Sequence, residues 1–511
     1  MNLKPEPDSL VGYSAPELRR MIGNKVVSPT ELLEACISRI EEVNPLVNAV
    51  TATDFEQARK IAREAESAVM KGAQLGLLHG LPVGVKDLEA TAGLLTTFGS
   101  PRFRDFVPSQ DVELVARLRQ SGGIVLAKTN VPEMGAGANT RNPVWGATGN
   151  PFNPNLIAGG SSGGSAAALA CDMLPICTGS DTGGSLRIPA AYCGVVGFRP
   201  SPGLVPNTRR LLGWSPISVV GPMGRTVEET CFQLAATAGS HPGDPLSYEV
   251  NPLTFLSIKA ADLRKLRVAF TTDFGVCDVD QSIRDVFLAR MKTLAPQFAC
   301  CDELKVDLGD VHRCFDVLRA EAFVAGTREA YENDPDSLGP NPRANYEMGL
   351  QMSLVDSAWA QTEQTRILQK FLAATRDYDL VFTPTTPVSA FPWTQLYAEN
   401  IDGLQQANYY RWLALTYIVT LTTLPAITIP CGTDASGMPF GLQVIGRFRG
   451  DIEILRAAQA LEEFFSSQKD LCRPRPDLKG IKETVPALRS IVTSSPQQPS
   501  TGSNFSSISV V

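Results

Sequence analysis

The sequence predicts an α/β fold: a single large domain with a mixed, mostly parallel twisted sheet that is covered by helices on both faces. The 511 residues are 43% hydrophobic and 19% charged, which is typical of a globular protein with a sizeable core. The segments 81–88 and 122–131 have strand patterns and are separated by a helical segment, the rhythm of parallel neighbours in an α/β sheet. Strand patterns return at 424–432 and 440–447, so both ends of the chain are expected to complete one sheet.

Residues 1–76 are predicted to form a helical layer of this same domain. The pattern is helical from Ser14 to Leu46, and Pro29 with Glu31 opens a second helix after Ser28. Within 52–71, apolar residues recur at the spacing of one helix face, namely Ala58, Ile61, Ala62, Ala65, Ala68 and Val69.

Residues 77–485 are expected to form the main body of the domain, with a variable middle region at 205–377. A strand ends near Lys86, and Ser109 is predicted to cap a helix that runs through Leu118. The other expected elements are a strand at 263–270, helices at 281–296 and 312–333, a loop at 334–346, a strand that enters a proline-rich loop at 378–393, and a helix capped by Asp451 that runs to Phe465. The Ser, Pro, Gln and Gly composition of 486–511 predicts a disordered tail.

Charge and cysteine usage narrow the class of protein. The net charge is −7 and no long basic run occurs, which disfavours a nucleic-acid partner. The N-terminal segment has no secretory apolar region, and the apolar run 411–434 is rich in threonine and broken by Pro425, so no membrane span is expected. The eleven cysteines include no CxxC pair and show no ligand spacing, which predicts reduced thiols in a cytoplasmic protein without a metal site.

The stretch 159–189 stands out because it holds two glycine and serine clusters, GGSSGG at 159–164 and DTGGS at 181–185. Glycines beside serines indicate a backbone that turns sharply and presents N–H groups to a negative or developing negative oxygen. A flexible linker is disfavoured by the apolar segments that follow both clusters. A nucleotide loop is disfavoured because neither GxxxxGK[ST] nor GxGxxG is matched.

These clusters, together with GLPVGVKDL upstream and the segment up to 205, resemble the amidase signature family. Lys86 precedes Ser161 by 75 residues, and Ser161 precedes Ser185 by 24, which is similar to the family's order of lysine, cis-serine and serine. The similarity covers about 77–205 and 378–465, whereas 205–377 matches weakly. The resemblance implies the amidase signature fold, and it implies that Ser185 is the nucleophile, Ser161 the bridging serine with a cis peptide bond, and Lys86 the base.

Simple chemistry agrees with these implied roles. A serine hydroxyl is a weak nucleophile until a base takes its proton, and the chain has only three histidines, His79, His241 and His312, none in an evident triad context. A lysine serves as that base only when it is neutral, which requires burial or a nearby positive charge. Lys86, at the end of an apolar strand, is placed for such burial.

The same motif suggests the residues around the nucleophile. Backbone N–H groups of Thr182, Gly183, Gly184 and Ser185 are predicted to form the oxyanion hole. Asp181 and Arg187 are expected to form a supporting ion pair, and Ser162 to cap the following helix. By analogy with the family, a substrate pocket is expected to be lined by Met134, Gly135, Trp214 and Ile217, and their apolar character suggests an aryl or alkyl group.

The sequence therefore predicts a serine amidohydrolase that needs no cofactor. Its substrate is expected to be a small-molecule carboxylic amide, with anilides, esters and carbamates as candidates, and neither nucleic acid nor membrane is an expected partner. The residues do not reveal the oligomeric state, and a homodimer is one option. Two alternatives stay open: the glutaminase subunit of a tRNA-dependent amidotransferase, and a binding protein that keeps the fold without turnover.

Overall fold

One eleven-stranded sheet organises the part of the chain that this computed structural model describes, residues 10–483 and 487–496. Its strands lie in the order β1-β3-β2-β8-β10-β9-β16-β17-β13-β11-β12. Their bounds are β1 Val50–Thr53, β2 Pro82–Lys86, β3 Ile124–Thr129, β8 Ile176–Asp181, β9 Val196–Arg199, β10 Val219–Gly224, β11 Arg267–Phe270, β12 Cys300–Glu303, β13 Leu380–Pro384, β16 Ala426–Thr433 and β17 Pro439–Ile445. Strands from both ends of the chain share this sheet, so the single α/β domain is confirmed.

The sheet is mixed, as predicted, but the expectation that it is mostly parallel is wrong. Parallel pairs join β2 to β3 and β8, and join β11 to β12 and β13. The other six neighbouring pairs are antiparallel. The strand and helix rhythm did not reveal β10, which inserts between β8 and β9, and β16 and β17 are joined by a short turn that only antiparallel strands permit.

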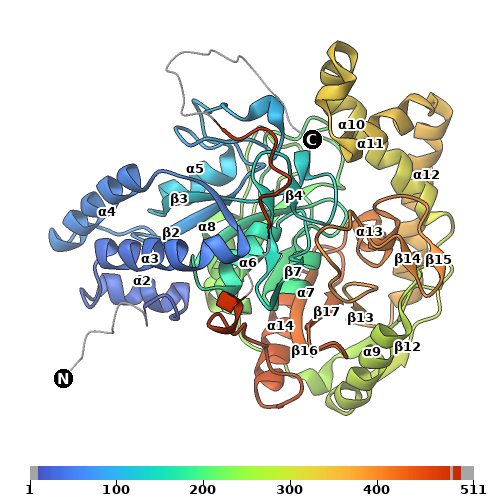
Figure 1. Cartoon of the computed structure of the whole chain (residues 1–511). Helices are drawn as coiled ribbons and strands as arrows, with labels where there is room; N and C mark the ends of the chain where they lie inside the picture. Colours follow the sequence, from blue (N-terminus) through green and yellow to red (C-terminus); the bar gives the residue numbers. More distant parts are fainter. Residues whose placement is uncertain (1–9, 484–486, 497–511) are drawn as a thin grey trace.

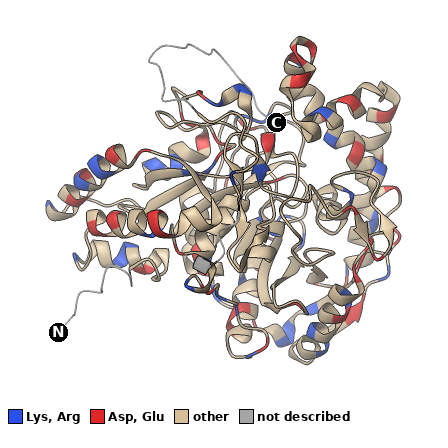
Figure 2. Cartoon of the chain, viewed as in Figure 1, with Lys and Arg blue, Asp and Glu red and all other residues tan. Residues whose placement is uncertain are grey.

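Helices flank the sheet and carry much of the charge. Figure 1 shows α2, α3 and α4 together on one side of the molecule, with α10, α11 and α12 together on the opposite side. Lys, Arg, Asp and Glu are concentrated on these outer helices, whereas most of the central strands are uncharged (Figure 2). The helices are α2 Ala15–Gly23, α3 Pro29–Val47, α4 Phe55–Met70, α5 Glu113–Gln120, α6 Gly163–Ala170, α7 Arg187–Cys193, α8 Val227–Thr237, α9 Gln281–Leu294, α10 Val311–Asn333, α11 Pro340–Leu350, α12 Leu354–Thr375, α13 Ala414–Thr422 and α14 Asp451–Ser466.

Three pairs of short strands lie outside the main sheet: β4 Arg141–Asn142 with β5 Gly146–Ala147, β6 Gly149–Asn150 with β7 Asn153–Ile157, and β14 Asn400–Ile401 with β15 Leu404–Gln405.

The predicted N-terminal helical layer is present with the expected starts. The Ser14 and Ser28 side chains each accept a hydrogen bond from the backbone N–H of the third residue of the following helix. In return, the Glu17 and Glu31 carboxylates accept a hydrogen bond from the backbone N–H of the serine. These reciprocal bonds satisfy N–H groups that a helix start leaves free. The edge strand β1, which joins this layer to the sheet, was not predicted.

Three predicted boundaries are wrong. Helix α5 begins at Glu113 after Val112, and Ser109 does not cap it. The expected loop at 334–346 contains the start of α11, because proline is well tolerated in the first turn of a helix and Pro340 occupies that position. Gly450 precedes α14, and Asp451 accepts a hydrogen bond from the Ser201 backbone N–H over 2.8 Å.

The predicted disordered tail is partly ordered. Within residues 487–496, the Leu488 carbonyl accepts from the Ala147 N–H over 2.8 Å, and Leu488 is only 3% exposed. The composition of the segment predicts disorder, but the burial of this one apolar residue holds part of the segment in place. The remaining tail residues, 486 and 497–511, lie outside the described residues.

All eleven cysteines fall within the described ranges, and each is a free thiol. Among the described helices, none is long and apolar enough to cross a membrane.

Helix α6 packs so closely against its neighbours that its second residue must be glycine. A Cβ at Gly164 would lie 2.6 Å from the Ala49 carbonyl oxygen and 2.7 Å from that of Asn130. These are backbone atoms, which cannot rotate away. The glycines of the 159–164 cluster therefore serve close packing of backbone as well as chemistry.

We expect Gly164→Ala to lower the free energy of unfolding by at least about 1–3 kcal/mol, because the added methyl group would force the packed backbone segments apart. The matched control is Gly213→Ala, whose new Cβ would meet Pro245 at an ordinary 3.5 Å. Urea unfolding of both variants measures the effect. Equal stability of the two variants would contradict the close packing described for α6.

Candidate active site

The ends of two parallel strands bring the site together. β2 ends at Lys86 and β8 ends at Asp181, and the two strands are direct parallel neighbours. The carboxyl ends of parallel strands meet at one edge of a sheet, where ligand sites of α/β proteins form. The Lys86 backbone N–H donates to Thr178 Oγ1 on β8 over 2.9 Å, which holds the two strand ends in register.

Lys86 is fully buried and its amine is surrounded by serines. Nζ lies 2.8 Å from Ser161 Oγ, 2.9 Å from Ser180 Oγ and 3.4 Å from the Ser180 carbonyl oxygen. Burial lowers the pKa of Lys86 to about 7, although the negative charges of Glu89 and Asp181 oppose the shift. The amine is therefore substantially neutral at physiological pH, and it faces a hydroxyl that can pass it a proton.

The two serine clusters lie against each other. The peptide bond between Gly160 and Ser161 is cis, as the resemblance implies. The Ser162 N–H donates to the Ser185 carbonyl oxygen over 3.3 Å, which joins the first cluster directly to the second. Ser161 and Ser185 line the same pocket, so the structure brings Lys86, Ser161 and Ser185 into one site.

One predicted oxyanion donor is not available. The Gly184 N–H donates to Asp181 Oδ1 over 3.0 Å, which occupies it within the protein. In the described chain no acceptor is found for the N–H groups of Thr182, Gly183 and Ser185. Three of the four predicted donors are thus left without a partner in the described chain, whereas the Gly184 N–H is already bound to the Asp181 carboxylate, which the sequence did not predict.

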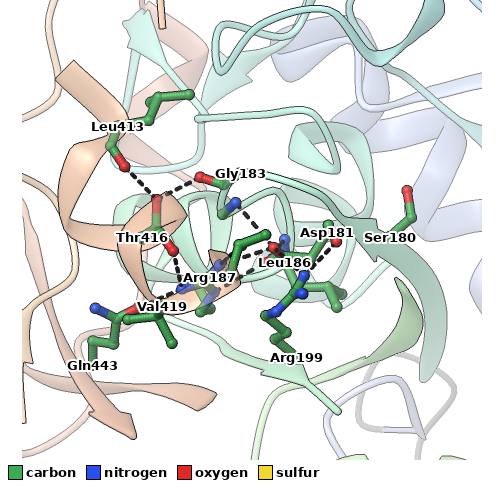
Figure 3. Close-up of polar contacts among 12 residues, drawn as sticks. Ser180, Asp181, Gly183, Leu186, Arg187, Arg199, Leu413, Thr416, Val419 and Gln443 are labelled. Atoms are coloured by element: carbon green, nitrogen blue, oxygen red, sulfur yellow. Dashed lines mark hydrogen bonds and ion pairs between the residues drawn. The ribbon is translucent and has the colours of Figure 1, made fainter. Parts of the chain in front are cut away.

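A buried ion cluster fixes the loop that carries Ser185 (Figure 3). Asp181 accepts from Arg187 through two nitrogens, at 2.9 and 3.0 Å, and from Arg199 at 3.1 Å. Burial by itself would raise the pKa of Asp181, but the two guanidinium groups outweigh it and hold that pKa well below its usual range. The predicted Asp181–Arg187 pair is present, and Arg199 is an additional member of it.

The C-terminal half of the chain braces the same loop (Figure 3). Arg187 donates to the Thr416 carbonyl oxygen on α13 over 2.9 Å and to Gln443 Oε1 on β17 over 2.6 Å. Thr416 Oγ1 donates in turn to the Gly183 carbonyl oxygen over 2.5 Å. These bonds orient the 182–186 backbone, because they pair its buried polar groups with partners on fixed elements.

Ser162 precedes α6 but does not cap it through its side chain. Its hydroxyl lies 3.4 Å from the Ser180 carbonyl oxygen and 3.5 Å from the Ser180 nitrogen, so it links the start of α6 to β8 instead. Ser165 also bonds β8, by donating to the Thr178 carbonyl oxygen over 2.8 Å. The expectation that Ser162 caps the helix is wrong, because its hydroxyl contacts the Ser180 backbone on β8 and makes no capping hydrogen bond.

The pocket that Ser161 and Ser185 line has both apolar and polar lining residues. Three of the four predicted lining residues, Met134, Gly135 and Ile217, contribute to it. Trp214 does not: it is 79% exposed, on a turn that points its ring to solvent. The apolar part also includes residues that were not predicted, namely Leu88, Phe98, Val112, Leu212, Val220 and Phe323.

The three histidines lie away from this pocket. His79 contacts the Ala65 carbonyl oxygen, His241 lies 3.6 Å from Glu113, and His312 contacts Tyr417 at 2.6 Å. None of them is among the lining residues. Lys86 is therefore the base that the geometry offers.

Sequence reasoning missed several polar residues at the site, of which three are important here. Ser180 contacts the Lys86 amine, and its place one residue before Asp181 in TGSDTGGS could have signalled it. Glu89, three residues after Lys86, lines the pocket, and so does Arg319 of α10. Arg319 lies in the middle region, where the resemblance was weak and no motif marked it.

Comparison with known proteins places the chain. The family model described as Amidase matches residues 31–455. An acylamidase from Rhodococcus erythropolis is 34% identical over 458 residues, which is 88% of this chain and 94% of that protein. A glutamyl-tRNA(Gln) amidotransferase subunit from Bacillus cereus strain B4264 is 34% identical over 481 residues, 89% of this chain and 98% of that protein.

A solved structure agrees with this placement. A bacterial aryl acylamidase of the amidase signature family superposes with a TM-score of 0.83 at 28% identity, covering 88% of this chain and 96% of its own. An α/β sheet with a buried lysine and two serine loops at its edge defines a class of amide-hydrolysing enzymes. The chain belongs to the amidase signature family, and it is an amide-hydrolysing enzyme rather than a binding relative without turnover.

We expect Asp181→Asn to lower the free energy of unfolding by about 3–5 kcal/mol, because it leaves two buried guanidinium groups without a counter-charge. The control is Asp377→Asn, which removes an exposed partner of Arg376 and should cost about 0–1 kcal/mol. Chemical denaturation of both variants measures the difference. A loss for Asp181→Asn no larger than for the control would contradict the bracing role of the cluster.

Proposed function

We propose that this amidase is a serine amidohydrolase that cleaves a carboxylic amide through an acyl-enzyme, with Ser185 as nucleophile, Ser161 as proton bridge and Lys86 as base. The observation that carries the proposal is the contact between the buried Lys86 amine and Ser161 Oγ, at 2.8 Å, in the pocket that Ser185 lines. The chemistry needs no metal or cofactor, because the lysine supplies the base. The lowered pKa of Lys86 supports the neutral form that this role requires.

The acylation step follows from these positions. Ser185 Oγ attacks the amide carbon and gives its proton to Ser161 Oγ, while Ser161 passes its own proton to the neutral Lys86 amine. The C–O bond forms and the carbonyl oxygen becomes negative. When the tetrahedral intermediate collapses, the C–N bond breaks and the amine leaves with the proton that Lys86 returns through Ser161.

The oxyanion and the second half-reaction use the same groups. N–H groups of Thr182, Gly183 and Ser185 stabilise the negative oxygen, at about 3 kcal/mol for each well-placed donor. Water then attacks the acyl-enzyme and gives its proton through Ser161 to Lys86. The acid leaves as Ser185 regains its proton, and the enzyme returns to its starting state.

The pocket favours an aryl or alkyl amide. Its apolar part includes Phe98, Met134 and Ile217, which suit a ring or a short chain. The acylamidase relative supports an amide substrate, and the aryl acylamidase structure supports an aryl group, as in an anilide. Esters and carbamates pass through the same tetrahedral geometry and are further candidate substrates.

A second candidate function is favoured by one observation: the chain covers 98% of a glutamyl-tRNA(Gln) amidotransferase subunit at 34% identity. In that case the chain would release ammonia from glutamine as one component of a larger enzyme. The two functions differ in substrate and partner. Anilide hydrolysis by the isolated chain supports the first, and glutamine hydrolysis that appears only with added partner proteins supports the second.

We expect the purified chain to hydrolyse members of a panel of alkyl amides, anilides, esters and carbamates, and Ser185→Ala to lose at least about a thousandfold in kcat. Product release is followed by chromatography. Ser257→Ala, which alters an exposed serine, is the matched control and should retain wild-type turnover. Turnover that survives in Ser185→Ala at the wild-type rate would refute the assignment of the nucleophile.

A further inference from the structure

A buried arginine lies on the face of α10 that is turned to the active site. Phe315, Arg319 and Phe323 are spaced at four residues, so they share one face of this helix. Phe315 packs against Gly183 in the loop that carries Ser185, and Arg319 and Phe323 line the pocket. Arg319 lies about one helical turn, about 6 Å along the helix axis, from Phe315, which contacts that loop.

The guanidinium of Arg319 is held in a fixed position. Nε donates to Asn345 Oδ1 over 3.0 Å, and Nη2 donates to the Tyr409 hydroxyl over 2.7 Å. The rings of Phe323 and Tyr410 flank it at 4.9 and 5.0 Å from their centroids. These contacts orient the group and favour its positive charge, but every partner is electrically neutral.

Arg319 has no carboxylate partner in the described part of the chain, although it is only 7% exposed. Asp316, three residues before Arg319 on the same helix, is paired with Arg411 at 2.7 Å and accepts from the Tyr410 hydroxyl. The third nitrogen of Arg319, Nη1, makes no hydrogen bond within the described residues and is not fully enclosed. A buried cation without a counter-charge is costly, so the arrangement is suited to a ligand that supplies the negative charge.

Arginines outnumber acids among the described residues that line the pocket. Arg209, Arg210 and Arg319 line it, and Glu89 is the one acid among the described lining residues. Burial raises the pKa of Glu89, and the positive charges of Lys128 and Lys86 oppose this shift. Arg210 is paired with Asp244 at 3.2 Å, so Arg319 is the buried cation of the pocket that is left for a ligand.

We propose that Arg319 binds a carboxylate of the substrate, so that the preferred substrates are amides that carry a carboxylate a few bonds from the scissile C–N bond. This inference rests on the proposed function and names its substrate class. The planar guanidinium suits a carboxylate because it donates through a rigid fork. Asn345 and Tyr409 position Arg319, and the apolar wall holds the rest of the substrate.

The test compares three anilides. Succinanilate carries a carboxylate on the acyl chain, 4-(butyrylamino)benzoate carries it on the leaving group, and butyranilide carries none. We expect the wild type to prefer at least one carboxylate substrate over butyranilide by about tenfold to a hundredfold in kcat/KM. Arg319→Gln should bring that ratio to about one, and Arg319→Lys, which keeps the charge, should retain part of it.

The matched control is Arg328→Gln, on the same helix, where an exposed arginine pairs with Glu332. It should keep the wild-type ratio. Two outcomes would overturn the inference: no preference for either carboxylate substrate by the wild type, or a ratio that Arg319→Gln leaves unchanged while both rates fall together. Thermal unfolding of each variant shows that it is folded.

A binding measurement separates this inference from the proposed function. Titration calorimetry with succinanilate and with 4-(butyrylamino)benzoate is carried out on Ser185→Ala and on Ser185→Ala combined with Arg319→Gln. Binding of either compound that is lost in the double variant supports the carboxylate site even if the wild type hydrolyses none of the three anilides. Equal binding by both variants, or none by either, overturns the site, whereas hydrolysis without carboxylate preference leaves the proposed function intact.

Discussion

The burial of the Lys86 amine is the interaction on which the rest of the site depends. An ammonium taken out of water is destabilised relative to the neutral amine, and this is what lowers the pKa of Lys86 to about 7. The site must nevertheless offer the amine partners of its own, and Ser161 and Ser180 supply them at 2.8 and 2.9 Å. In the proposed mechanism, a neutral lysine next to a hydroxyl replaces the histidine that serine hydrolases more often use.

The two serine loops depend on packing from opposite ends of the chain. The first loop is fixed by α6, whose glycine at 164 lets it approach Ala49 and Asn130. The second is fixed by Asp181, Arg187 and Arg199, which connect it to α13 and β17. Because the C-terminal strands complete both the sheet and this ion cluster, the site and the single domain are formed by the same contacts.

Much of the candidate active site was predictable, for identifiable reasons. Strand patterning placed Lys86 at a strand end, and the glycine and serine clusters marked the loops that carry Ser161 and Ser185. The family resemblance, rather than periodicity, related these three residues. Trp214 was misplaced because an aromatic residue in a turn can face solvent or pocket, and sequence does not decide between them. The bond from the Gly184 N–H was not predicted because the direction of this N–H depends on where the Asp181 carboxylate lies.

The residues that lay beyond prediction owe their position to distant parts of the chain. Arg319 is oriented by Asn345 and Tyr409, which are 26 and 90 residues away, so no local pattern reveals it. The insertion of β10 between β8 and β9 likewise depends on contacts between distant parts of the chain. Local patterns predict elements well, whereas the pairing of strands and the orientation of buried polar groups require the assembled fold.

Labelling with a fluorophosphonate tests the central claim most directly, because it identifies the nucleophile and the effect of the base without a known substrate. Mass spectrometry would locate the adduct, and its rate of formation would be measured between about pH 5 and pH 9. We expect an adduct on Ser185 that forms faster as pH rises through about 7, where Lys86 loses its proton, and that is suppressed in Lys86→Ala. An adduct on another residue, or a rate that Lys86→Ala does not change, would contradict the role of the buried lysine.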